Sequence, residues 1–176
     1  MSADDVEAME ESGDYASIAV LLASSSGSED AEEIAEACCD GLLRLASSAD
    51  KEAMGAAAWP AVVRTLEAYS SDSPAVAEVA LSVLAKLAPS NQRLFSPSLS
   101  AALLAAMSEN DEGEPTLQEQ ACLLVQALAE NDRENAEALS KAGFAEELER
   151  AGTKIVNERN KAYPLRAAAA IKSAMA

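Results

Sequence analysis

Apolar residues along this chain recur with the spacing of amphipathic helices rather than of strands. Alternation of apolar and polar residues never persists for the length of a strand. β-Branched residues are few, and aromatic residues make up only 3% of the sequence, although both favour sheets. The pattern predicts an all-α protein.

The helical pattern itself repeats. The clearest copy runs from Leu117 to Ala151, and weaker copies are aligned by a Leu-Ala pair at Leu45, Leu87 and Leu128, about forty residues apart. Two helical turns before each of these leucines stands a small residue that lets neighbouring helices approach closely: Cys38, Ala80 and Ala121. A chain that repeats one helical unit is typical of a stack of such units, whose product is an extended surface rather than a catalytic pocket.

Extended to both ends, this period accounts for the whole chain as one domain of four units, each with two shorter helices before a long one. The predicted units are roughly 1–46, 47–88, 89–130 and 131–176. In the second unit, Met54, Val62 and Leu66 indicate the two shorter helices, and Pro60 after Trp59 marks the start of one of them. We expect Trp59 to pack in the core.

Three of the long helices carry start signals. Asp30 with Glu33, and Thr116 with Glu119, have the spacing of capping boxes. Ser73 before Pro74 predicts a cap followed by a first-turn proline.

The repeated unit resembles the armadillo-repeat family. The resemblance is carried by Gln118-Glu119-Gln120-Ala121, Ala127-Leu128-Ala129, Asn135, Ala142-Gly143 and Leu148, with Asn91 at the Asn position of the preceding unit. Ala57-Ala58 and Ser98-Leu99 replace the usual Ala-Gly. The resemblance implies a right-handed superhelical solenoid of about four three-helix armadillo-like repeats. In such a fold the third helices line a concave groove that holds an extended peptide or a helix of a partner.

The sequence lacks the residues and motifs that several kinds of catalysis require. The chain has no histidine, which removes the commonest general base and every His-ligated zinc site. Its seven glycines form neither a Walker loop nor a G-x-G-x-x-G turn. Cys38 and Cys39 are adjacent and lie near Glu36 and Asp40, which oppose thiolate formation, so buried packing is the expected role. We expect no enzyme activity, no cofactor and no metal site.

Charge is spread unevenly along the chain. The net charge is −17, and residues 1–43 hold twelve acidic residues and no Lys or Arg. From Lys154 onward, five basic residues oppose the single acidic Glu158. The acidic region serves either as a solubilising cap or as a contact surface, and one alternative is that copies of the chain meet head to tail. The charge argues against a nucleic-acid partner and favours a basic or mixed-charge protein segment.

The start of the sequence lacks the features of a signal peptide, and no stretch is long and apolar enough for a membrane span. We therefore expect no membrane insertion and an intracellular, cytoplasmic location, with the nucleus left open.

Groove positions follow from the helical phase of the long helices. The positions that match the Trp and Asn of the family are Asp40 and Arg44, Ser82 and Lys86, Leu123 and Ala127, and Ala169 and Ser173. None of them is Trp or Asn, which argues against recognition of nuclear-import cargo. One turn earlier, Glu36, Glu78 and Glu119 form a candidate acidic ladder, although helix dipoles and capping also favour Glu there.

Three functions remain open. The first is a scaffold or adaptor that binds a partner segment in the groove. The second is a structural subunit of a large multiprotein assembly, favoured by the small, apolar helix predicted from Pro164 to Met175. The third is a chaperone regulator of the armadillo nucleotide-exchange type, with which the number of repeats is compatible.

Overall fold

The computed structural model describes residues 4–109, 115–154 and 161–176, and these are helical with no strand. The elements are α1 (Asp4–Glu11), α2 (Tyr15–Ser24), α3 (Ala31–Leu45), α4 (Lys51–Tyr69), α5 (Pro74–Asn91), the 3₁₀ helix η1 (Gln92–Leu94), α6 (Pro97–Glu109), α7 (Pro115–Ala129), α8 (Arg133–Lys141), α9 (Phe144–Lys154) and α10 (Ala162–Met175). The prediction of an all-α protein is confirmed for this part of the chain.

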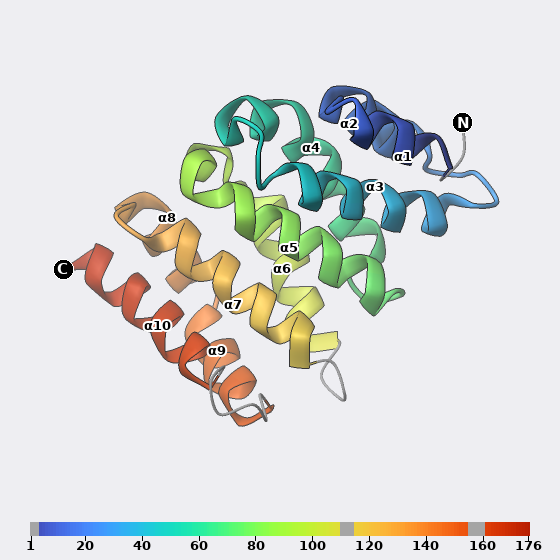
Figure 1. Ribbon diagram of the computed structural model, residues 1–176. Coiled ribbons are helices and arrows are strands. Elements are labelled where there is room, and N and C mark those ends of the chain that lie inside the picture. Colours follow the sequence, from blue (N-terminus) through green and yellow to red (C-terminus); the bar gives the residue numbers. More distant parts are fainter. Residues whose placement is uncertain (1–3, 110–114, 155–160) are drawn as a thin grey trace.

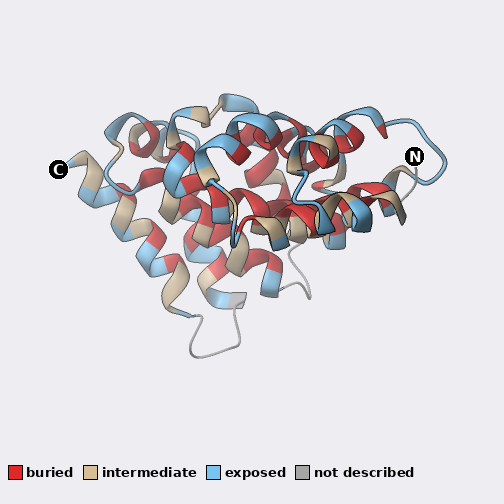
Figure 2. Ribbon diagram, turned by 45° about the horizontal axis from the view of Figure 1, so that its top comes forward, coloured by how far each residue is buried: buried red, intermediate tan, exposed pale blue. Residues whose placement is uncertain are grey.

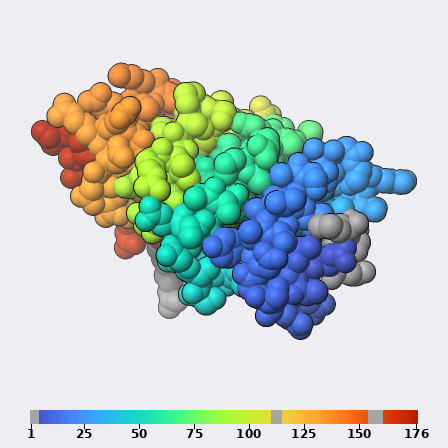
Figure 3. Space-filling model, turned by 90° about the horizontal axis from the view of Figure 1, so that it is seen from above, coloured from blue at the N-terminus to red at the C-terminus, as the bar shows by residue number. Residues whose placement is uncertain are grey.

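Four helices, α3, α5, α7 and α10, lie side by side in one row (Figure 1). Each packs on the next: α3 on α5, α5 on α7, and α7 on α10. A second row follows the same order, with α2 on α4, α4 on α6 and α6 on α9. The space-filling view in Figure 3 shows the same progression from the N-terminal to the C-terminal part of the chain. The helices α1 and α2 therefore lie at one end of the molecule, and α10 lies at the other.

Buried residues collect where the helices face one another, and exposed ones cover the outside (Figure 2). The small residues Cys38, Ala80 and Ala121 are fully buried, as their phase predicts. Gly41 also lies at a close contact between helices, since a Cβ at this position would lie 3.0 Å from Val6 Cγ1 and 3.4 Å from Ile18 Cδ1. Small side chains on α3 thus let α1 and α2 pack closely against it.

The second unit differs from the prediction. One continuous helix, α4, replaces the two short helices expected there, and Pro60 lies inside it rather than at a helix start. A proline leaves the carbonyl four residues upstream without its helical donor. Here that carbonyl belongs to Ala56, an exposed residue, so water can solvate it. Trp59 is buried, as predicted, with 3% of its surface exposed.

The start signals have mixed outcomes. The Ser73 hydroxyl accepts a hydrogen bond from the Val76 amide and Pro74 opens α5, which confirms that cap. Asp30 is the N-cap of α3, but its side chain makes no capping hydrogen bond, so the predicted box is absent. Thr116 cannot be the cap of α7, because the helix already begins at Pro115.

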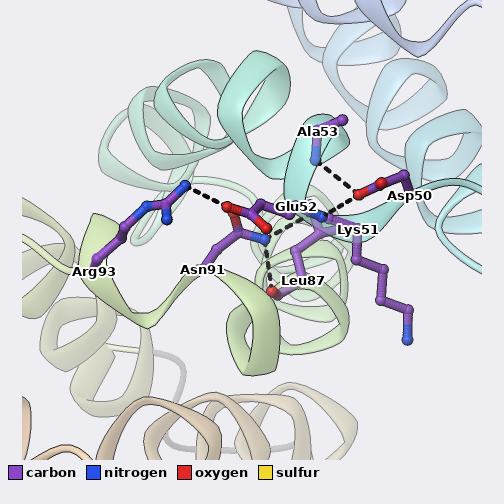
Figure 4. Close-up of polar contacts among 7 residues, drawn as sticks. All are labelled: Asp50, Lys51, Glu52, Ala53, Leu87, Asn91 and Arg93. Atoms are coloured by element: carbon purple, nitrogen blue, oxygen red, sulfur yellow. Dashed lines mark hydrogen bonds and ion pairs between the residues drawn. The ribbon is translucent and has the colours of Figure 1, made fainter.

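A buried asparagine joins α4 to the end of α5 (Figure 4). Asn91 Nδ2 donates hydrogen bonds to the main-chain oxygens of Lys51, 2.8 Å away, and Leu87, 2.9 Å away. The Asn91 amide occupies the space beside Gly55, where a Cβ would overlap it. At the rim of this junction, Arg93 pairs with Glu52 and Asp50 caps the start of α4.

A second asparagine makes the same kind of contact further along. Asn135 Nδ2 donates to the main-chain oxygens of Gln92, 3.0 Å away, and Leu128, 3.1 Å away. Gln92 occupies the place of Lys51 in this second junction, and Leu128 occupies that of Leu87. The two asparagines to which the resemblance pointed therefore have one structural role, which is to tie a helix end to the preceding unit.

Candidate functional site

The outer side of the α3, α5, α7 and α10 row, here called the row face, carries three hollows. The N-terminal hollow, about 600 Å³, lies between α1 and α3. The central hollow, about 400 Å³, lies among α3, α5 and α7, and the C-terminal hollow, about 360 Å³, lies between α7 and α10. Gln126 and Glu130 line both the central and the C-terminal hollow, so these two adjoin each other.

All eight positions inferred from helical phase line one of these hollows. Asp40 and Arg44 lie in the N-terminal hollow. The central hollow contains Ser82, Lys86, Leu123 and Ala127, and the C-terminal hollow contains Ala169 and Ser173. The structure therefore brings Ser82, Lys86 and Leu123 together and places Asp40 and Arg44 in a separate, neighbouring depression.

The N-terminal hollow is acidic and contains one ion pair. Arg44 Nε donates a hydrogen bond to Glu10 Oε1 at 2.6 Å. This hydrogen bond lowers the pKa of Glu10 and raises that of Arg44, and the charges of Asp40 and Glu7 raise the Arg44 pKa further. With Glu7 and Glu11 also lining the hollow, its acidic groups outnumber the single cation.

The central hollow is mainly apolar at its base. Its apolar lining consists of Leu43, Ala85, Pro89, Leu123 and Ala127. Around them are Lys86, Gln120, Gln126 and Glu130. Lys86 is exposed and forms no ion pair with any residue that the structure describes. Ser82 uses its hydroxyl within α5, donating to the main-chain oxygen of Glu78 at 2.9 Å. An apolar group flanked by an acidic one fits this chemistry.

The candidate acidic ladder lies outside these hollows. Glu36 is exposed on α3, whereas Glu78 on α5 and Glu119 on α7 are half-buried. None of the three lines the N-terminal, central or C-terminal hollow. Their joint role in binding stays a prediction. The residues that line the hollows lie one turn or more further along each helix.

Two features escaped the sequence analysis. Glu7, Glu10 and Glu11 join the row face because α1 packs on α3, a contact that no local pattern indicates. A hollow of about 580 Å³ also lies between the start of α6 and α8, lined by Phe95, Pro97, Leu104 and Lys141 among others. The sequence analysis assigned no binding residue to this hollow.

The cysteines are buried thiols. Cys38, Cys39 and Cys122 are free and fully buried. Burial raises the pKa of Cys38 and of Cys122 to about 12, and raises that of Cys39 as well, so all three stay protonated at neutral pH. Within the described ranges, no group of three or more Cys, Asp or Glu residues could hold a metal ion.

No helix in the described residues has the length and apolar character that crossing a membrane requires. A scan against protein-family models and a search of curated proteins found no match to this chain. Its function is therefore inferred from its own residues.

Proposed function

We propose that this chain is a non-catalytic protein-binding scaffold or adaptor, which holds an extended or helical segment of a partner along the row face. The observation that carries the proposal is the succession of neighbouring hollows along the row face. Four adjacent helices each contribute residues to them, and the central and C-terminal hollows share Gln126 and Glu130. Such a surface suits a long segment better than a small molecule.

The proposed architecture is the armadillo-like solenoid that the sequence resembles. Support comes from the ordered packing of each helix row and from the equivalent hydrogen bonds of Asn91 and Asn135. In this interpretation the row of α3, α5, α7 and α10 corresponds to the third helices of successive repeats, and the row face is the concave groove.

The charges of the row face favour a partner segment of mixed charge. The N-terminal hollow has an excess of carboxylates, which attracts Lys or Arg. Lys86 in the central hollow and Arg166 in the C-terminal hollow instead suit carboxylates of the partner. The segment should therefore be basic where it meets α1 and α3, and apolar with acidic flanks where it meets α5, α7 and α10.

Selection of displayed random peptides tests the proposal. Peptides enriched on the wild-type chain should lose at least tenfold in affinity for the Leu123→Glu variant, because a charge then occupies the apolar base of the central hollow. Lys86→Glu should weaken most the peptides that carry acidic residues. Ala57→Glu, which adds the same charge at an exposed position of α4 that lines none of these hollows, is the matched control and should bind like the wild type.

Peptides that bind all variants equally would show that the row face is not the binding surface. Circular dichroism melts of every variant separate lost binding from lost folding. A selection that enriches no peptide on the wild-type chain would also count against the proposal, since it predicts a surface that accepts isolated segments.

A specific observation also favours the structural-subunit function. Among the described residues, the two large hydrophobic side chains that remain exposed are Val20 on α2 and Leu165 on α10, with 67% and 73% of their surface accessible. They lie on α2 and α10, the terminal helices of the rows, and neither lines the central hollow. A subunit held within an assembly would cover such positions.

A further inference from the structure

The outer surfaces of α2 and α10 resemble each other in shape and differ in electrostatic character. On α10, the residues turned away from its buried Pro164, Ala167 and Ile171 form an exposed stripe of Leu165, Ala169 and Lys172. On α2, the residues turned away from the core form an exposed stripe of Ala16, Val20 and Ala23. Each stripe has one large apolar residue among small ones, so two such helices can approach closely.

The charges around the two stripes are opposite. Arg166 and Lys172 are the charged residues of α10, which has no Asp or Glu. The α2 helix has no charged residue, but acidic residues lie at its start and on the neighbouring α1. Glu7 and Glu11 lie on α1, which packs against α2, and Asp14 caps the start of α2. Glu158 and Arg159, which the sequence analysis counted in the basic region, lie outside the described residues, as does the side chain of Lys154.

We propose that the outer stripe of α10 docks on the outer stripe of α2 in a second copy of this chain, so that copies associate head to tail. Leu165 packs beside Val20, and the alanines allow the helix axes to come close. Leu165 and Val20, which carry the proposed contact, line none of the row-face hollows, whereas Ala169 of the α10 stripe also lines the C-terminal hollow, so the contact borders the row face without using its central hollow.

The spacing of the charges selects one orientation. Lys172 stands about 10 Å along α10 from Leu165, in the C-terminal direction, and Asp14 stands about 9 Å along α2 from Val20, in the N-terminal direction. With Leu165 beside Val20, an antiparallel arrangement therefore places Lys172 near Asp14. In a parallel arrangement, Lys172 and Asp14 would lie on opposite sides of the Leu165–Val20 contact, each about two helical turns away from it. The contact is heterologous, so copies can add at both ends.

Contacts between like ends are disfavoured by charge. Two α1–α2 ends would bring acidic surfaces together, whereas the α10 end meets the α1–α2 end with opposite charges. The net charge of −17 opposes any self-association through long-range repulsion. At about 0.15 M salt the Debye length is about 8 Å, which screens repulsion between the bodies of two copies more than contacts inside the interface.

Sedimentation of the full chain at about 0.15 M salt, at concentrations up to about 1 mM, tests the proposal. The wild type should form dimers and longer species as the concentration rises. Val20→Glu and Leu165→Glu should each weaken self-association at least tenfold. An equimolar mixture of the two variants should nevertheless form a one-to-one dimer, because one retains an intact α10 stripe and the other an intact α2 stripe.

Two controls keep the result interpretable. Lys172→Glu should weaken association more than Lys86→Glu, which makes the same charge change in the central hollow. Ala57→Glu on α4 should associate like the wild type. Circular dichroism melts establish that each variant is folded.

A wild type that stays monomeric throughout the concentration range would overturn the proposal. Dimers that stop growing and that neither variant disrupts would overturn the head-to-tail arrangement, as would a mixture of variants that shows no recovery. A Lys86→Glu variant as weak as Lys172→Glu would show that net charge alone governs association.

Discussion

On its buried side, α5 has nearly the same residues as the equivalent positions of α7. On its exposed side, the residues differ between the two helices. On the buried side, Ala80 and Leu87 have close counterparts in Ala121 and Leu128 of α7. On the exposed side, Ser82 and Lys86 correspond to Leu123 and Ala127 of α7, which differ from them in both charge and size. The buried side is constrained because each helix row must accept the next helix in the same way. The exposed side has no such constraint, so its residues are free to differ from one long helix to the next.

If this contrast is correct, changes on the buried side should affect stability and changes on the exposed side should affect binding. Three glycines in helices give the sharpest test, since the structure predicts a different result for each. A Cβ at Gly55 would overlap the Asn91 amide, and a Cβ at Gly41 would lie 3.0 Å from Val6 Cγ1. At Gly152 it would make only ordinary contact with Pro164, 3.8 Å away.

Gly55→Ala should therefore reduce the free energy of unfolding the most, by about 3 kcal/mol, because Asn91 must move and lose two hydrogen bonds. Gly41→Ala should cost about 1 kcal/mol, since Val6 can shift slightly. Gly152→Ala should be neutral or stabilising by up to about 1 kcal/mol, because Ala favours the helix. Urea unfolding followed by circular dichroism measures all three, and an equal effect at Gly55 and Gly152 would contradict the close packing beside Asn91.

The two asparagine junctions form the next test. Asn91 is fully buried, whereas 8% of Asn135 is exposed, and each amide nitrogen donates to two main-chain oxygens. Asn91→Ala should cost about 3 kcal/mol and Asn135→Ala about 2 kcal/mol in unfolding free energy, since each removes two hydrogen bonds from a packed junction between helices. The Asn91→Ala change should also relieve the clash at Gly55, so the double variant should be more stable than the sum of the single effects predicts.

The repetition of the buried side is also why much of the fold could be predicted. The small residues at Cys38 and Ala80, and the leucines that follow them, recur at a fixed phase, so their burial could be inferred without knowing the packing. Pro60 was misinterpreted because a proline beside a tryptophan indicates a helix start locally. The burial of residues both before and after it, from Met54 to Leu66, instead maintains one long helix.

The exposed side could be predicted only in part. Helical phase located Asp40, Lys86 and Leu123, because residues at equivalent positions of stacked helices lie on one side of the row. It did not reveal Glu10 as the partner of Arg44, since these residues are 34 positions apart and meet only because α1 packs on α3. The chemistry of each hollow depends on such non-repeating contacts, which cannot be inferred from the sequence repeat.

On the exposed side, Lys86→Glu should change the free energy of unfolding by no more than about 0.5 kcal/mol. The side chain is exposed and forms no ion pair among the described residues, so its removal breaks no contact of the fold. Urea unfolding of this variant beside Asn91→Ala compares the two sides of one helix directly. A loss as large as that of Asn91→Ala would end the distinction between a structural and a recognition side.

The smallest effect concerns the Glu10–Arg44 pair, which lies on the exposed side but joins two helices. Arg44 lowers the pKa of Glu10 through a hydrogen bond, so folding favours the ionised carboxylate. The stabilisation is therefore present at neutral pH and is lost in acid, as the pH falls through the lowered pKa of Glu10 and the carboxylate becomes protonated. Because 58% of the Arg44 side chain is exposed, solvent screens the pair and limits its contribution to a few tenths of a kcal/mol.

Glu10→Gln should accordingly lower the unfolding free energy slightly at pH 7 and leave it nearly unchanged at pH 3, relative to the wild type. Because the difference is small, an NMR titration gives the more sensitive measurement. The Glu10 carboxyl should titrate at a higher pH in an Arg44→Gln variant than in the wild type, whereas Arg133→Gln, which removes the partner of Glu137 on α8, should leave it in place. A Glu10 pKa that does not respond to the loss of Arg44 would mean that the two helices are joined by apolar contacts such as Val6 against Gly41. The N-terminal hollow would then have Arg44 available for a partner's carboxylate.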